Sequence, residues 1–117
     1  MFIAYIIIAI LMALLAVASG AGKLQHNPRV VSSIHGVIGV PMPWLPVLAA
    51  CEIAGALGIL IGIFWPLLGL AAAVGLVIYF VGAIIAHLRV RDFKGVGNPI
   101  LPLVLAVATL VLRILSI

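Results

Sequence analysis

Charged residues are scarce in this 117-residue chain: Asp, Glu, Lys and Arg together make up 7% of it, whereas the apolar set makes up 68%. A soluble domain carries about a quarter charged residues, so the composition excludes a water-soluble globule. It also excludes intrinsic disorder, because disordered chains are rich in charge and poor in apolar residues. The chain is therefore expected to be an integral membrane protein, with the lipid bilayer as its first partner.

Cysteine is nearly absent, and the patterns of common catalytic and metal sites are missing. The single cysteine, Cys51, excludes an intramolecular disulfide and a dithiol relay within the chain. No Cys/His cluster has zinc spacing, no two histidines are placed as a haem ligand pair, and no nucleophilic triad or phosphate-binding glycine loop occurs. The sequence thus has no haem or metal signature and contains no self-sufficient catalytic motif, which leaves enzyme activity open.

What the sequence does contain is four long apolar runs, at about residues 2–22, 46–63, 66–87 and 99–117. A helix needs about 20 residues to cross a bilayer. Trp44 and Trp65 flank the second run and lie 21 residues apart, or about 31 Å along a helix, which matches the spacing of the two membrane interfaces. The prediction is an all-α fold with one domain, residues 1–117, forming a four-helix transmembrane bundle.

The few charges indicate how this bundle is oriented. Five of the six Lys and Arg residues fall in the two loops that share one side of a four-span protein: Lys23, Arg29, Arg89, Arg91 and Lys94. The positive-inside rule predicts that these loops are cytoplasmic and that both termini lie outside; labelling of a C-terminal cysteine only after permeabilisation would contradict this. The basic residues form no stripe with exposed aromatics, so nucleic acid is excluded as a partner.

Helix contacts are expected where small residues recur on one face, because packing in lipid relies on close approach of backbones. Three such rows are present: Ala9, Ala13, Ala16 and Gly20; Ala54, Gly58 and Gly62; and Gly75, Gly82 and Ala86. The loop before the second run is long, and we expect a short surface helix over residues 29–38 within it. Arg113, near the C-terminus, is expected to extend to the outer interface.

Glu52 is the one acidic residue inside an apolar run. An ionised group within a span costs at least about 2.5–3.5 kcal/mol, so it needs a partner or a role. It lies about 9 Å beyond Pro46 along a helix, and Lys23, His87 and Arg89 end neighbouring runs near that level. A polar cluster of these four residues has two interpretations. One is a pocket for a proton-linked or quinone-like ligand, and the other is a buried ion pair that fixes the helix arrangement.

Several short motifs resemble the DoxX-like family. They are Ser19-Gly-Ala-Gly-Lys-Leu24, Gly39-Val-Pro41, Glu52-Ile-Ala-Gly-Ala-Leu-Gly58, and His87-Leu-Arg89 followed by Asp92. The resemblance implies a four-helix protein of the bacterial inner (plasma) membrane, with relatives that include a small subunit of a thiosulfate:quinone oxidoreductase. It places the family pattern at Lys23, Glu52, Gly55, His87 and Arg89.

Three functions remain open at this point. The first is a small accessory or assembly subunit of a membrane complex, redox-linked, whose partner is another membrane protein or a second copy of the chain. The second is a quinone-binding oxidoreductase subunit with a pocket near Glu52 and His87, which makes a quinone the one cofactor under consideration. The third is a small proton-coupled transporter that uses Glu52.

Overall fold

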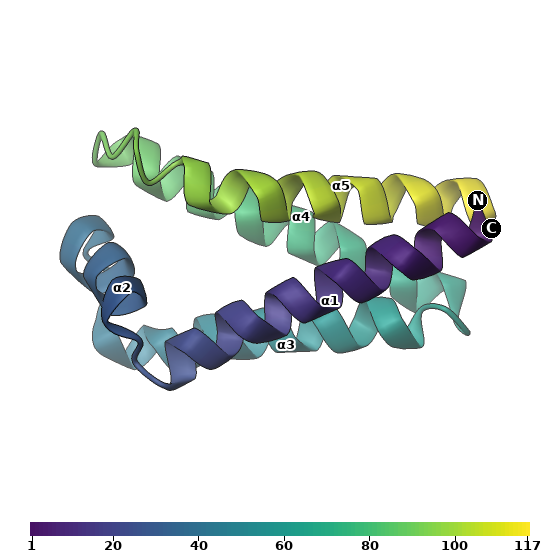
Figure 1. Cartoon of the computed structure of the whole chain (residues 1–117), viewed down its shortest axis with the longest axis horizontal. Coiled ribbons are helices and arrows are strands. Elements are labelled where there is room, and N and C mark those ends of the chain that lie inside the picture. Colours follow the sequence, from purple (N-terminus) through teal and green to yellow (C-terminus); the bar gives the residue numbers. More distant parts are fainter.

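The computed structural model describes all residues from 1 to 117 as helices joined by turns (Figure 1). The long helices are α1 (Phe2–Leu24), α3 (Leu45–Ile61), α4 (Pro66–Arg89) and α5 (Gly97–Ser116), and the short segments are α2 (Pro28–Val31), the π-helix η1 (Ser32–Ile38) and the 3-10 helix η2 (Met42–Trp44). Four helical stretches are long and apolar enough to cross a membrane. The predicted all-α membrane bundle is thereby confirmed.

The long helices form a ring in which α1 and α4 each pack against both α3 and α5. The row of small residues on α1 is fully buried, as predicted. On α3, Gly58 and Gly62 meet Ala72 and Gly69 of α4 so closely that no side chain fits between the two helices. Small residues therefore permit the close approach of α3 and α4.

The row predicted on α4 was wrong. Gly75 and Gly82 are exposed and have open space where a side chain would be. The buried face of α4 runs instead from the small residues Gly69 and Ala73 to the larger residues Leu76, Phe80 and His87 further along the helix. This gradient has a geometric cause, because the helix pairs α1/α3 and α4/α5 lie close together at the end that holds both termini and spread apart toward the other end (Figure 1).

The segment between α1 and α3 lies at the spread end of the bundle, close to the ends of the two helix pairs (Figure 1). Asn27 begins it by accepting a hydrogen bond from the Arg29 N–H at 3.0 Å, with Pro28 at the first helical position. The helix turns end at Gly39, whose φ of +87° favours glycine. The short helix predicted over residues 29–38 is thus present, as α2 continuing into η1.

Arg113 does not extend to the interface, and that prediction was also wrong. The residue is 2% exposed and points into the narrow end of the bundle. Its Nη1 donates to the Gly62 carbonyl at 3.2 Å, and its guanidinium lies 4.6 Å from the centre of the Tyr5 ring. The reason is that α3 ends at this level, and the free carbonyls of a helix C-terminus attract a cation, as does an aromatic face.

Candidate ligand-binding site

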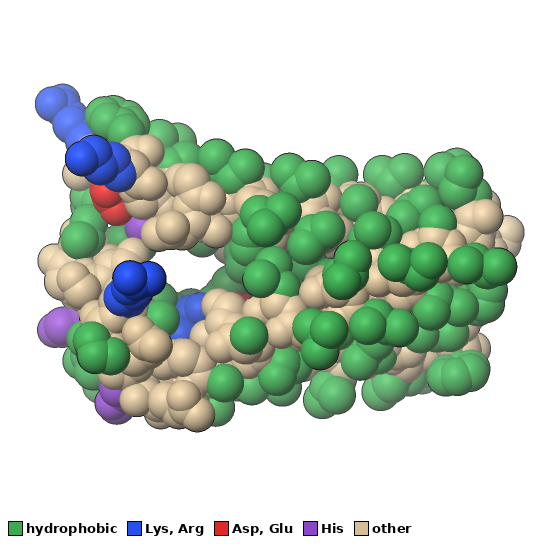
Figure 2. All heavy atoms as spheres, in the orientation of Figure 1, with side chains coloured by type: hydrophobic (Ala, Val, Ile, Leu, Met, Phe, Trp, Pro, Cys, Tyr) green, Lys and Arg blue, Asp and Glu red, His purple; other side chains and the backbone are tan.

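A cavity of about 610 Å³ occupies the spread end of the bundle. Figure 2 shows it as a hollow between the two helix pairs. Its wall is mostly apolar and includes Ile34, Ile38, Leu48, Phe80 and Ala83, while its polar lining includes Ser19, Lys23, Glu52, Tyr79 and His87. A concave, largely apolar space of this size with a few converging polar groups is typical of a small-molecule site.

Glu52 is the centre of the polar lining. Its side chain is completely buried, and Oε1 accepts hydrogen bonds from the Lys23 ammonium and, at 2.6 Å, from the Tyr79 hydroxyl. Lys23 also donates to the Ser19 hydroxyl at 2.9 Å. Removing two charges from water is costly unless further hydrogen bonds satisfy them, and this network from α1, α3 and α4 supplies those bonds for Lys23 and for one oxygen of Glu52.

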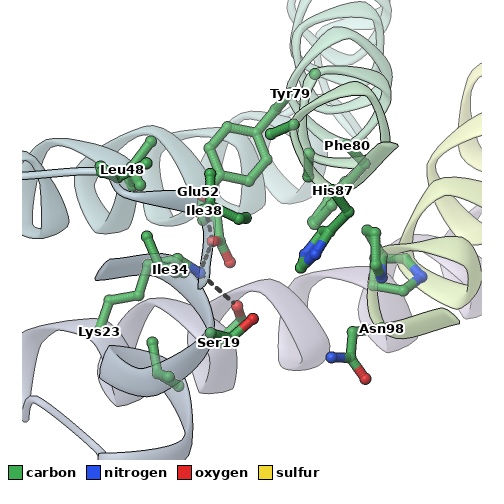
Figure 3. Close-up of a pocket in the computed structure, with 18 of the residues that line it drawn as sticks. Ser19, Lys23, Ile34, Ile38, Leu48, Glu52, Tyr79, Phe80, His87 and Asn98 are labelled. Atoms are coloured by element: carbon green, nitrogen blue, oxygen red, sulfur yellow. Dashed lines mark hydrogen bonds and ion pairs between the residues drawn. The ribbon is translucent and has the colours of Figure 1, made fainter. Parts of the chain in front are cut away.

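The second oxygen of Glu52, Oε2, is buried without any hydrogen-bond partner. Figure 3 shows the carboxyl group facing the open cavity, with the imidazole of His87 on the opposite side. Leaving a buried acceptor unpaired costs about 1–3 kcal/mol, and more when it is charged. The arrangement therefore leaves a strong, unused acceptor buried at the wall of the cavity.

His87 is held by the loop that follows α4. Its Nδ1 lies 2.8 Å from Oδ2 of Asp92, whose other oxygen accepts the Gly95 N–H at 3.1 Å. The His87 bond, and then the Gly95 bond, lower the pKa of the Asp92 carboxyl. A carboxylate at Nδ1 fixes the proton there, so in the neutral ring Nε2 is an acceptor.

Gly95 makes this loop geometry possible. A side chain at position 95 would collide with the Asp92 carboxylate, and its Cβ would lie 2.6 Å from Nδ1 of His87. The loop residue is thus required to be glycine if Asp92 is to orient His87.

Three of the four predicted site residues, Lys23, Glu52 and His87, line this cavity. Arg89 does not; it is exposed and has no side-chain partner in the structure. At about 100° per residue, two positions beyond His87 is nearly the opposite side of α4. The position of Arg89 along the helix therefore did not determine the side of α4 on which its side chain lies.

The sequence reasoning missed Tyr79 as a partner of Glu52. One signal was available, since a tyrosine in the middle of an apolar run must find a partner for its hydroxyl. Tyr79 also lies about two turns before His87, on the same face of the helix.

No three His, Cys, Asp or Glu side chains come together anywhere in the chain to hold a metal ion. The polar groups that line the cavity suit hydrogen bonding to a ligand.

The four apolar helices, and a largely apolar cavity with a few buried polar groups, define a small four-helix integral membrane protein. The model of the DoxX-like family matches residues 7–109, and the chain belongs to that family. Comparisons with curated proteins and with solved structures gave no match.

Proposed function

We propose that this protein is the quinone-binding subunit of a membrane redox complex and that the reduced, quinol form binds in the cavity at Glu52. The observation that supports this most is the unpaired Oε2 of a fully buried carboxylate facing His87 across an apolar cavity. Of the three functions left open by the sequence, this one accounts best for the geometry of the site, because a pure assembly subunit has no need of a buried, unused acceptor.

The hydrogen-bonding pattern favours the quinol over the quinone. A quinol carries two hydroxyl donors on opposite sides of its ring, and the cavity offers two acceptors, Oε2 of Glu52 and Nε2 of neutral His87. Phe80 and Ile38 supply apolar contacts for the ring between them. A quinone has two carbonyl acceptors instead, which gain no hydrogen bond from these two acceptors.

The same two residues can take part in oxidation of the quinol. The reaction removes two electrons and two protons from the two hydroxyls, leaving two carbonyls. Glu52 and His87 are the groups placed to receive the protons. The electrons go to a redox cofactor of a partner subunit, which is why we propose a subunit of a complex and not a separate enzyme.

A binding experiment tests this proposal. The purified protein in lipid nanodiscs is titrated with decylubiquinol, kept reduced, and bound ligand is measured after extraction. We expect Glu52→Gln to weaken binding at least tenfold, about 1.4 kcal/mol. Lys23 retains the amide oxygen at its side, so the amide NH₂ replaces Oε2 and the ligand hydroxyl loses the atom to which it donates. For the same reason the variant should bind decylubiquinone relatively better.

The control is Cys51→Ser, at the adjacent position on the exposed side of α3, which should bind as the wild type does. Failure of the wild-type protein to bind decylubiquinol would overturn the proposal, and so would equal binding by Glu52→Gln.

A further inference from the structure

The cavity is not closed toward the membrane. Its wall includes Ile78 and Gly82 of α4, and both residues are exposed. They lie about 10–17 Å along α4 from its loop-side end, at a depth where the surroundings are hydrocarbon. In Figure 2 the background is visible through the hollow, so the cavity opens on both faces of the molecule in that view.

Small side chains on α4 keep one edge of the cavity open. Gly82 has no atom within 4 Å of the position its Cβ would occupy, and Ala83 and Ala86 beside it also line the cavity. The spreading of the helix pairs adds to the width. The opening therefore depends both on the small residues of α4 and on the spreading of the two helix pairs.

A second cavity, of about 420 Å³, adjoins the first at the loop end and shares Arg29, Ser33 and Asn98 with it. Its lining includes the polar or charged residues Arg29, Ser32, Ser33, Asp92 and Asn98. The loop end of the cavity is thus bordered by polar side chains, whereas its edge on α4 is formed by Ile78 and Gly82. Only the edge on α4 suits a hydrocarbon chain, because polar groups lose their hydration without gaining partners beside such a chain.

We infer that the ligand is a long-tailed amphiphile dissolved in the bilayer, which enters sideways past Gly82 and leaves its tail in that opening while its head binds at Glu52. This inference rests on the proposed function and adds the route and the tail to it. A cavity of about 610 Å³ is within the range for a drug-sized molecule, so the head and the first part of the tail fill it. The rest of a long tail must extend into the lipid.

Two matched glycines on α4 test the inference. Gly75 is exposed like Gly82 and has the same open space around it, but it does not line the cavity. We expect Gly82→Leu to lower the affinity for decylubiquinol at least tenfold in nanodiscs. The same variant should lower the affinity for the tail-less ring, ubiquinol-0, less than threefold, and Gly75→Leu should change neither.

Each outcome has one meaning. Wild-type protein that binds neither quinol removes the proposed function itself, and the inference with it. Wild-type protein that binds both, together with Gly82→Leu protein that binds decylubiquinol normally, overturns the placement of the tail at Gly82 and leaves the function standing. An equal loss for both ligands in Gly82→Leu also overturns the inference, since the leucine then blocks the head and not the tail. Retained binding of ubiquinol-0 by Gly82→Leu shows that the variant is folded.

Discussion

Both ends of the bundle bury charged side chains from membrane-spanning helices, but in different surroundings. At the narrow end, Arg113 is packed among the Tyr5 ring, the Phe2 ring and the Gly62 carbonyl. At the spread end, Glu52 is paired with Lys23 on one oxygen and faces a cavity with the other. One end is filled with protein atoms, and the other leaves space.

The comparison shows that a buried charge alone does not mark a site. Arg113 also has a buried atom without a partner, its Nε, yet Arg113 lines neither of the two cavities described. Its contacts are carbonyls and aromatic rings of α1 and α3, which tie three helices together. Glu52 differs because the unpaired atom and the space for a ligand coincide. We therefore expect changes at the narrow end to alter stability and changes at the spread end to alter binding.

The largest effect on stability is expected from Gly62→Ala. The new methyl group would collide with the Gly69 backbone across the α3–α4 crossing and lie 3.0 Å from the Gly58 carbonyl. Overpacking of this kind costs about 1–3 kcal/mol, and here both sides of the contact are backbone, which cannot rotate away. Unfolding by SDS titration measures the loss.

The control for this change is Gly75→Ala, where the methyl group enters open space, and it should leave the unfolding midpoint nearly unchanged. Affinity for decylubiquinol should be retained in both variants. Equal stability of the two variants would show that the narrow end is not the rigid part of the bundle.

Features determined by position along the chain could be predicted from the sequence. The helices follow from apolar run length, and the common level of Lys23, Glu52 and His87 follows from counting residues at a fixed rise. Pro66 begins α4 as its position after Phe64-Trp65 indicates. These properties are local, so no knowledge of neighbouring helices was needed.

Rotation about a helix axis could not be predicted in the same way. Arg89 and the Gly75–Gly82 row were assigned to the wrong side of α4, because the direction a residue faces depends on which helices pack beside it. Arg113 turned inward for a related reason: its partners, the Gly62 carbonyl and the Tyr5 ring, come from residues more than 50 positions away. The spreading of the helix pairs, which creates the cavity, is likewise a property of the whole bundle.

Removing one hydroxyl at each end sharpens the comparison. Tyr5→Phe deletes a buried hydrogen bond of 2.7 Å to the Ile59 carbonyl and is expected to cost about 1 kcal/mol of stability with no change in quinol affinity. Tyr79→Phe deletes the bond to Oε1 of Glu52. The Glu52 carboxyl is then less firmly oriented. We therefore expect decylubiquinol to bind about three- to tenfold more weakly, which is a loss of about 0.7–1.4 kcal/mol in binding free energy.

The same two measurements, SDS unfolding and nanodisc titration, are made on both tyrosine variants. The variants exchange the same pair of amino acids, so the difference between them reflects location alone. A fall in quinol affinity with Tyr5→Phe, or no fall with Tyr79→Phe, would contradict the assignment of stability to the narrow end and of binding to the spread end.

The smallest effect is expected from acid, and only at the spread end. Hydrogen bonds from His87 and then Gly95 hold the pKa of Asp92 below its ordinary value. A carboxyl with a lowered folded-state pKa stabilises the fold above its unfolded-state pKa, and this contribution disappears as the pH falls through the folded-state pKa.

Wild-type protein should therefore be slightly more stable to heat than Asp92→Asn at pH 7, by less than the stability that Tyr5→Phe loses. The difference should begin to shrink at about pH 4 and vanish only below the lowered folded-state pKa of Asp92. Arg29 lines the same loop-side cavity as Asp92, and His87 loses its carboxylate partner in Asp92→Asn. A difference that is constant from pH 7 to pH 3 would mean that the asparagine acts through the shape of the loop and not through the lost charge.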